Sequence, residues 1–341
     1  MLRGALICNA FLRSGKFVEH YAWLKEAAER QGMALSLFDN TKLCRVLGGE
    51  RHPMSSRKQH GSADGKERRD AQGWDAWRQE WDWLDSVDFV IFWDKDIPGG
   101  KYLEAVCREK GIGIYNEVDA IACCDHKFFT YEKIWEWNRG QKDEAQIKLI
   151  PTIMAPMTYE NIGYANLEFV QDVIGHLGLP LIVKECYGSF GMQVYRADTG
   201  EEVCALTEKL AGKPILYQKY LESTMGNDVR IQVVGGQAVA AMHRFSETGD
   251  FRANLTNGGS MEPYPPSEEE RCIAVQVCTV LGLDFGGVDL LFDHEGRASI
   301  LCEVNSNAHF KNIFDCTGVN VADCIMEHVR RKVEAQNFGK H

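Results

Sequence analysis

Residues 285–307 read "FGGVDLLFDHEGRASILCEVNSN". Two apolar runs surround the segment "DHEG", whose polar residues and glycine are typical of a hairpin turn. Each run is interrupted by side chains that carry oxygen. Asp289 lies in the first run, and Glu303, Asn305 and Asn307 occupy every second position at the end of the other. The pattern predicts two antiparallel strands of a buried sheet with polar side chains gathered on one face.

The alternation places Glu303 and Asn305 on the same side of their strand, with Cys302 and Val304 on the opposite side. The hairpin brings Asp289 back beside them. Two carboxylates and an amide oxygen form a hard-ligand set that suits Mg²⁺ bridging the phosphates of a nucleotide. The alternative is a pair of solvated carboxylates at the end of a sheet. The apolar surroundings make that alternative costly, because buried charges need partners.

A second candidate site lies in "LIVKECYGSFGM", residues 181–192. Lys184 ends an apolar strand just before a loop that contains Gly188 and Gly191. A lysine followed by a glycine-bearing loop can hold phosphates, because the ammonium group meets the oxygen charge and backbone N–H groups close over it. The Walker pattern is absent. An edge lysine that extends its ammonium group to water explains Lys184 equally well, and this segment alone does not separate the two interpretations.

Three arginines lie among apolar residues in the same half of the chain. Arg230 follows Asp228 on a predicted strand, Arg244 lies on the next strand, and Arg252 lies in the loop after it, near Asn254. Each arginine alone is typical of a protein surface. Together with the predicted metal site they indicate a pocket for anions whose charge changes during a reaction.

Strand-like and helical segments alternate in residues 1–118, which predicts a parallel sheet covered by helices. The polar, locally basic insertion at residues 48–70 is interpreted as a solvated loop, in preference to a flap that binds phosphate or an acceptor. After it, Trp74, Trp77 and Trp81 recur with Leu84 at helical spacing. This stripe favours core packing, with a dimer face as the alternative.

Composition excludes several classes of protein. The chain has 341 residues, a formal net charge of −11 and 45% hydrophobic residues. The acidic balance argues against a nucleic-acid partner, and the longest apolar runs are too short for a membrane helix. The N-terminus reads as a first strand and not as a signal peptide, so a cytoplasmic protein is expected. Its 12 cysteines include no C-x-x-C pair, so a zinc or redox role is not expected.

The ordered set of segments in residues 120–330 resembles the ATP-grasp superfamily, and within it the RimK-type carboxylate–amine ligases. "LIVKECYGSFGM" is similar to the phosphate-contacting strand and loop, and "LYQKYLE" to the hinge that meets adenine. "GNDVR" and "HRFSETGDFRANLTNGGS" resemble the family's aspartate and arginine segments. "GVDLL" and "CEVNSN" resemble its two metal strands.

The resemblance implies an α/β fold with a pre-ATP-grasp domain at 1–118 that contains a parallel sheet. A small lid domain at 119–217 and a C-terminal antiparallel domain at 218–335 would follow, with a tail at 336–341. It also implies three sets of site residues. The catalytic residues are Arg230, Arg244 and Arg252. The nucleotide-binding residues are Lys127, Lys184, Gly188, Ser189, Gly191, Gln218, Lys219, Tyr220, Asp228, Arg252, Ala253 and Asn254. The metal ligands are Asp289, Glu303 and Asn305.

The implied reaction is ATP-dependent ligation. A carboxylate attacks the γ-phosphate, and an amine then displaces phosphate from the acyl phosphate. The expected cofactors are ATP and two Mg²⁺ ions, which Mn²⁺ can replace. The expected partners are an amino-acid or peptide substrate, a protein or peptide acceptor, and further copies of the chain in a homo-oligomer. A kinase-like phosphotransferase and a non-catalytic ATP-binding regulator are the alternatives.

This chain departs from the family after Asn305. The family usually continues with Ser-Pro-Gly or a similar turn, whereas here Asn307 and His309 follow. We expect these two residues and Lys311 at the substrate edge of the site, and not on the metal.

Overall fold

The computed structural model describes residues 1–44, 82–188, 191–224, 226–247 and 259–338. The chain divides into two compact units, Met1–Tyr115 with Val333–His341, and Asn116–Lys332. The insertion at 48–70 and the tryptophan stripe at Trp74, Trp77 and Trp81 lie outside the described residues, and so their predictions stay untested. The predicted three-domain boundaries also stay predictions.

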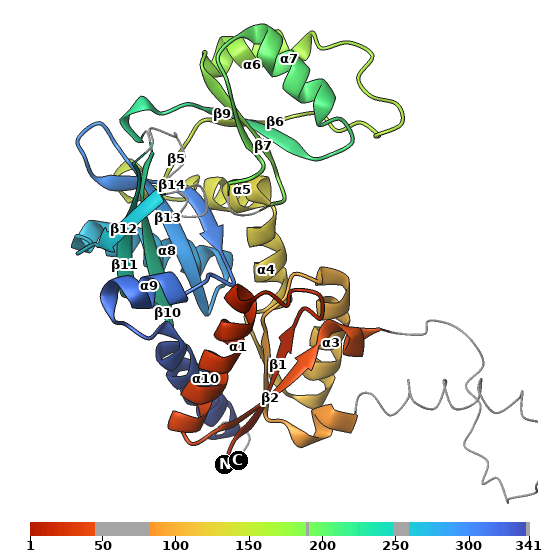
Figure 1. Cartoon of the computed structure of the whole chain (residues 1–341), viewed down its shortest axis with the longest axis vertical. Helices are drawn as coiled ribbons and strands as arrows, with labels where there is room; N and C mark the ends of the chain where they lie inside the picture. Colours follow the sequence, from red (N-terminus) through yellow and green to blue (C-terminus); the bar gives the residue numbers. More distant parts are fainter. Residues whose placement is uncertain (45–81, 189–190, 225, 248–258, 339–341) are drawn as a thin grey trace, which may run out of the picture. The chain divides into compact units, whose positions relative to one another are not determined.

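The first unit contains the predicted parallel sheet, which is confirmed (Figure 1). Its strands have the order β2-β1-β3-β4, and every pairing between them is parallel. Helix α3 begins where the Asp96 side chain accepts a hydrogen bond from the Gly99 N–H, and ends at Gly111, which has a positive φ of 67°. The elements are β1 (Arg3–Cys8), α1 (Gly15–Arg30), β2 (Ala34–Asp39), η1 (Asn40–Leu43), η2 (Asp82–Ser86), β3 (Phe89–Phe92), α3 (Ile97–Lys110) and β4 (Gly113–Tyr115).

The second unit contains two sheets. The smaller sheet is antiparallel, with the strand order β6-β9-β7-β8. Helices α6 and α7 supply apolar side chains to its core, where Val170, Val173 and Val203 pack against Leu181 and Tyr217. The elements are β6 (Thr152–Met154), α6 (Phe169–Leu177), β7 (Leu181–Glu185), β8 (Val194–Ala197), α7 (Gly200–Lys209) and β9 (Ile215–Lys219).

The larger sheet of this unit has the order β12-β11-β10-β13-β14-β5. Its first five strands are antiparallel, and β5 joins the edge in parallel to β14, so the sheet is mixed. The strands are β5 (Lys148–Leu149), β10 (Asn227–Val234), β11 (Gln237–Ser246), β12 (Gly259–Pro263), β13 (Phe285–Phe292) and β14 (Ala298–Asn305). The remaining elements are α4 (Val118–Asp125), α5 (Lys127–Asn138), η3 (Asp143–Ala145), η4 (Glu222–Thr224), α8 (Glu268–Leu281), α9 (Lys311–Thr317) and α10 (Val321–Phe338).

The two faces of the larger sheet differ in chemistry, and this difference positions the site. Alternate residues of β10 and β13, among them Val229, Ile231, Val288 and Leu290, form a core with α8. The residues between them, which include Asp289, therefore face the other way. Helix α8 begins with a reciprocal capping box between Ser267 and Glu270, whose bonds satisfy free N–H groups at the first turn.

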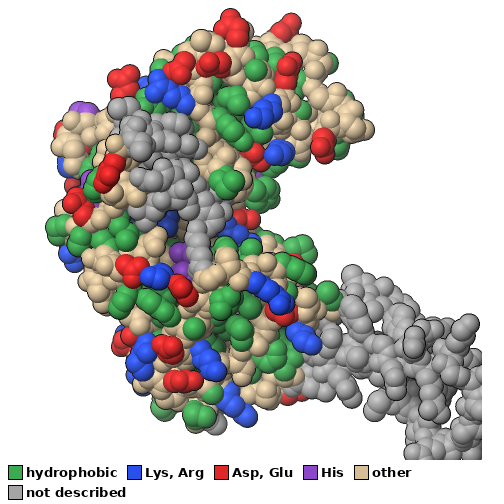
Figure 2. Space-filling view, in the orientation of Figure 1, with side chains coloured by type: hydrophobic (Ala, Val, Ile, Leu, Met, Phe, Trp, Pro, Cys, Tyr) green, Lys and Arg blue, Asp and Glu red, His purple; other side chains and the backbone are tan. Residues whose placement is uncertain are grey.

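On the face that it draws, Figure 2 shows Lys and Arg side chains interspersed with Asp and Glu. Across the described helices, none is both long and apolar enough to cross a membrane.

Candidate active site

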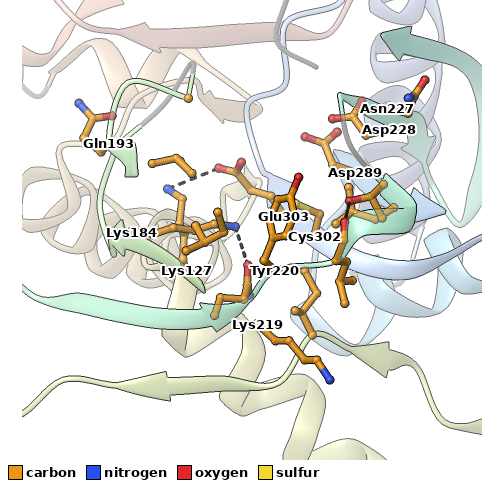
Figure 3. Close-up of a pocket in the computed structure, with 18 of the residues that line it drawn as sticks. Lys127, Lys184, Gln193, Lys219, Tyr220, Asn227, Asp228, Asp289, Cys302 and Glu303 are labelled. Carbon is orange, nitrogen blue, oxygen red and sulfur yellow. Dashed lines mark hydrogen bonds and ion pairs between the residues drawn. The ribbon is translucent and has the colours of Figure 1, made fainter. Parts of the chain in front are cut away.

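One pocket of the second unit brings together ten of the residues that the sequence singled out (Figure 3). They come from the smaller sheet, from α5 and from the polar face of the larger sheet. These residues are Lys127, Lys184, Gly188, Gly191, Gln218, Lys219, Tyr220, Asp228, Asp289 and Glu303. Arg230, Arg244 and Asn305 do not line the pocket but lie next to its walls. Ser189, Arg252, Ala253 and Asn254 lie outside the described residues.

Two lysines approach the carboxylates at one end of this pocket. The Lys127 Nζ lies 3.6 Å from the Glu303 Oε1 and donates a 2.9 Å hydrogen bond to the backbone oxygen of Gly188. Lys184 donates from Nζ to the Gln218 Oε1 at 2.6 Å. The side chain of Lys219 points away from these two lysines in Figure 3. Two cationic groups on one wall therefore face the carboxylates on the other.

Local contacts fix Lys127 at the first turn of α5. The backbone N–H of Lys127 donates to the oxygen of Cys186 at 3.0 Å, which ties the helix to the base of the glycine loop. His126 caps the helix by accepting from the Phe129 N–H, and its ring meets Tyr187 edge-on at 4.9 Å. Burial lowers the pKa of His126, so its ring is neutral and able to accept this bond at neutral pH.

Glycine is favoured at position 188 by the backbone conformation of the loop. Its φ is +132°, a region that side chains with a Cβ rarely adopt. A Cβ at this position would also lie 2.4 Å from the Oε1 of Gln193. Gln193 itself lines the pocket, and no feature of the sequence pointed to it beyond its place two residues after Gly191.

The carboxylates of the larger sheet are paired with arginines. Arg230 donates two hydrogen bonds to Asp289, at 2.7 Å and 2.6 Å, and Arg244 donates two to Asp228, at 2.6 Å and 2.7 Å. Arg244 also reaches Asp289 at 3.1 Å. The sheet register explains the grouping, because Arg230 pairs with Asp289 and Asp228 pairs with Arg244 across neighbouring strands.

These four side chains form a buried network of two positive and two negative charges. Burial raises the pKa of both carboxyl groups, and the guanidinium groups lower it. The net direction is downward for Asp289, which contacts both arginines. It is upward for Asp228, which also feels the charge of Asp289. The arginines that the sequence placed in an anion pocket thus hold the carboxylates in fixed positions.

The expectation that Cys302 points away from Glu303 is wrong. The ladder shifts register between Asp289 and Leu290, whose partners are Glu303 and Leu301, so Cys302 is the extra residue of a β-bulge. Cys302 lines the pocket together with Glu303 (Figure 3), whereas Val304 is buried in the core as expected. Burial raises the pKa of the Cys302 thiol to about 11, so the thiol is protonated at neutral pH.

The residues predicted as metal ligands fit a hard divalent cation. Asp289 pairs with Glu303 across the two strands, and Asn305 lies two residues farther along β14. The amide nitrogen of Asn305 is buried without a hydrogen-bond partner among the described residues. A flip of the amide would put its oxygen there. Within the described ranges no three His, Cys, Asp or Glu side chains gather as a metal site. The predicted set of metal ligands therefore needs the amide oxygen of Asn305 in addition to the two carboxylates.

Apolar side chains also line the pocket. Ile150, Ile182, Leu221 and Leu291 contribute to its lining beside Tyr220. Arg196 lies over the Tyr220 ring, with its guanidinium carbon 4.6 Å from the ring centroid. A flat aromatic group fits among apolar side chains of this kind, and the lysines suit a polyphosphate. The geometry suits a nucleotide.

Comparisons with known proteins agree with this geometry. Residues 146–329 match the family described as "RimK-like ATP-grasp domain". A Mycoplasma pneumoniae protein named "Uncharacterized protein MG012 homolog" is 33% identical over 222 residues, which cover 64% of this chain and 72% of that protein. A "Probable alpha-L-glutamate ligase" of Methanococcoides burtonii is 37% identical over 173 residues, or 50% of this chain and 57% of that protein.

A solved structure described as "ATP-grasp ligase PsnB complexed with minimal precursor, Mg, and ADP" shares the fold. It aligns with a TM-score of 0.58 and 16% sequence identity, over 98% of this chain and 97% of that chain.

Proposed function

This chain belongs to the RimK-like ATP-grasp family of carboxylate–amine ligases, and we propose that it uses ATP to join an amino acid or peptide to a second substrate. One observation carries the proposal. One pocket brings Lys127 and Lys184 together with Asp289 and Glu303, and apolar side chains line the same pocket. The products would be an amide, ADP and phosphate.

In this proposal the lysines hold the α- and β-phosphates, and the backbone of Gly188, Ser189 and Gly191 covers them. The adenine would lie among the apolar residues of the pocket, beside the hinge residues Lys219 and Tyr220. The remaining nucleotide contacts proposed from the sequence are Gln218, Asp228, Arg252, Ala253 and Asn254.

Asp289, Glu303 and Asn305 would hold two Mg²⁺ ions, which Mn²⁺ can replace. Bound there, the cations would neutralise the phosphate oxygens and so reduce the repulsion that an incoming carboxylate meets. Asp289 and Glu303 already have cationic partners in Arg230 and Lys127. The site therefore balances its own negative charge.

The proposed chemistry has two steps. A carboxylate oxygen of the first substrate attacks the γ-phosphorus, and ADP leaves with the electron pair of the broken P–O bond. An amine nitrogen then attacks the acyl carbon, loses its proton, and phosphate leaves. Arg230, Arg244 and Arg252 would stabilise the negative charge of the acyl phosphate and of the tetrahedral species that follows. Asp289 and Asp228 already hold Arg230 and Arg244 in place. These two arginines therefore need little reorganisation during the reaction.

The names of similar proteins suggest the substrate class. One relative is named a glutamate ligase, and the solved ligase is described with a precursor. We propose glutamate as the first amino acid to test, with a peptide or protein terminus as the acceptor.

Hydroxylamine trapping tests the reaction type. Purified protein is incubated with ATP, Mg²⁺, hydroxylamine and either glutamate or pooled amino acids. We expect an acyl hydroxamate and ADP, because hydroxylamine captures the acyl phosphate. A phosphorylated alcohol with ADP would support a phosphotransferase instead. AMP with pyrophosphate would contradict the acyl-phosphate route.

The variant Glu303→Gln tests whether the trapped product comes from this pocket. Removing one carboxylate from the site should reduce ATP turnover by about 100-fold, the cost of losing one electrostatic contact in an active site. Glu295→Gln is the matched control, because Glu295 is exposed at the turn of the same hairpin. Near-normal turnover by Glu303→Gln would show that the metal assignment is wrong.

A further inference from the structure

A turn at residues 306–309 follows directly on Asn305, the last residue of β14. Asn305 pairs with Gly287, and Gly287 pairs with Gln232 on β10. On these strands the neighbouring residues Glu303 and Asp289 line the pocket, but Asn305, Gly287 and Gln232 do not. The Asn305–Gly287 pair therefore lies two residue pairs past the Glu303–Asp289 pair, on the same face of the sheet.

Two buried amide side chains hold the backbone of this turn. Asn116 donates from Nδ2 to the Ser306 oxygen at 3.1 Å, and Gln232 donates from Nε2 to the His309 oxygen at 3.3 Å. Asn116 is fully buried and Gln232 is 2% exposed. Burying an amide is costly unless it is hydrogen-bonded, so these contacts fix the turn at both ends.

Asn116 also bonds the start of β13. Its Oδ1 accepts from the N–H groups of Asp284 and Phe285, and its Nδ2 donates to the Phe285 oxygen. These bonds give Asn116 a structural role, because they tie the start of β13 to the turn. Gln232 differs, because the one described hydrogen bond of its side chain is to the turn.

The glycines of β13 allow the turn to lie close to the sheet. A Cβ on Gly287 would lie 2.7 Å from the Cβ of Ala308, closer than two such atoms can approach. A Cβ on Gly286 would lie 3.2 Å from the Asn305 oxygen. The turn thus presses against β13 from one side while Gln232 holds it from β10.

We propose that Gln232 is a positioning residue for the divalent-cation site. By holding the His309 oxygen, it keeps the turn against β13 and so keeps Asn305, the strand residue just before the turn, near Asp289 and Glu303. Gln232 does not line the nucleotide pocket, so its loss acts through Asn305. The inference rests on the proposed function, because that function gives Asn305 its role as a ligand.

The test measures Mg²⁺ dependence with the full-length chain, without using ligase activity. A fluorescent ADP analogue is titrated without metal and then at increasing Mg²⁺. For Gln232→Met, which keeps the length of the side chain but not its donor, metal-free affinity should stay within about twofold. The Mg²⁺ concentration for half-saturation should rise about tenfold, the usual cost of losing an outer contact of a metal ligand. Gln237→Met, at an exposed position on β11, is the control.

A second variant displaces the same turn from the opposite side. Gly287→Ala creates the clash with Ala308 and should shift the Mg²⁺ dependence in the same direction. The double variant Gly287→Ala with Ala308→Gly removes the clash and should restore half-saturation to within about twofold. A purely structural defect in β13 would not be rescued by removing one methyl group from the turn.

Several outcomes would overturn the inference. An unchanged Mg²⁺ dependence in a folded Gln232→Met protein would do so, as would failure of Ala308→Gly to rescue Gly287→Ala. Equal weakening of metal-free nucleotide binding would show that Gln232 supports the whole pocket and not the cation site. If Mg²⁺ does not change the affinity of the wild-type protein for the analogue, the cation site is absent and the inference about Gln232 is wrong. If that response is present but no hydroxamate forms, only the proposed ligase reaction fails.

Discussion

Lys127 and Lys184 are held by partners of different kinds. The Lys127 ammonium group bonds the Gly188 backbone oxygen and pairs with the Glu303 carboxylate, whereas the Lys184 ammonium group bonds the side-chain amide of Gln218. Gln218 is 3% exposed, and its Nε2 donates to the Thr152 Oγ1 at 2.9 Å. The position of the Lys184 ammonium group is therefore set by a second residue that the smaller sheet holds in place.

Replacing Gln218 tests this dependence. In Gln218→Leu the Lys184 ammonium group loses its acceptor, and we expect nucleotide affinity to fall about tenfold, within the range for a hydrogen bond to a charged group. Thr152→Val is the matched control, because it removes the other bond of Gln218 and leaves Lys184 its acceptor. Calorimetry with ADP measures both. Equal losses in the two variants would mean that the smaller sheet, and not Lys184, had been disturbed.

The sequence predicted which residues gather at the pocket better than it predicted what each one contacts. Lys184 and Glu303 were identifiable because a charged residue at the end of an apolar strand is conspicuous. The contact between Gln218 and Lys184 was not, because the two residues lie 34 positions apart and meet only through strand pairing. Asn116 and Gln232 gave no local signal for the same reason.

At the scale of elements, the β13–β14 hairpin is the part that the sequence described best. Its two strands and the turn between them were predicted, but the bulge at Cys302 was not. Bulges depend on how the ladder hydrogen bonds form and not on side-chain pattern. The alternation of residues 302–305 therefore gave the correct face for Glu303 and Val304 and the wrong one for Cys302.

Asp293 closes the turn of this hairpin. Burial alone would raise the pKa of Asp293, but the N–H groups of Arg297 and Glu295 and the Ser299 hydroxyl hold it well below the usual range. Its Oδ1 accepts from Glu295 and Arg297 at 2.9 Å and 3.0 Å, and its Oδ2 accepts from Ser299 at 2.8 Å. A carboxylate can accept all these bonds, whereas an asparagine cannot.

Asp293→Asn should lower the free energy of unfolding by about 1–3 kcal/mol at pH 7, the cost of lost hydrogen bonds to a charged group. The lowered pKa sets the direction of the pH dependence. The stabilisation from Asp293 is complete above about pH 4, near the pKa of an aspartate in an unfolded chain, and is lost as the pH falls below that value. Urea unfolding between pH 3 and 7 measures it. If the free energies of unfolding of the variant and the wild type differ by as much at pH 3 as at pH 7, the prediction is contradicted.

At the scale of the whole molecule, every described residue that lines the nucleotide pocket belongs to the unit Asn116–Lys332. The first unit contributes none of them. The residues that match the family, 146–329, also lie within the second unit. The fold of the first unit was predictable as a parallel sheet from its alternating segments, but no motif in it indicated a role.

Hydrogen exchange with and without Mg²⁺ and ADP tests this division. Nucleotide binding should slow amide exchange in β7, β9, β13 and β14, because these strands carry the pocket residues and binding opposes their local opening. Exchange in β1 and β3 should stay unchanged. Equal protection in the first unit would show that the nucleotide stabilises the chain as a whole.

The pairing of β5 with β14 has a consequence for protein synthesis. Lys148 pairs with Ile300, and Asn116 bonds Ser306 across 190 positions, so the larger sheet unites segments that leave the ribosome far apart in time. The smaller sheet is complete once Lys219 has been added. A sheet with such non-local pairing cannot be completed until its last strand has been synthesised. During translation the wall with Lys184 can therefore form early, while the wall with Asp289 and Glu303 forms only after almost the entire unit has emerged.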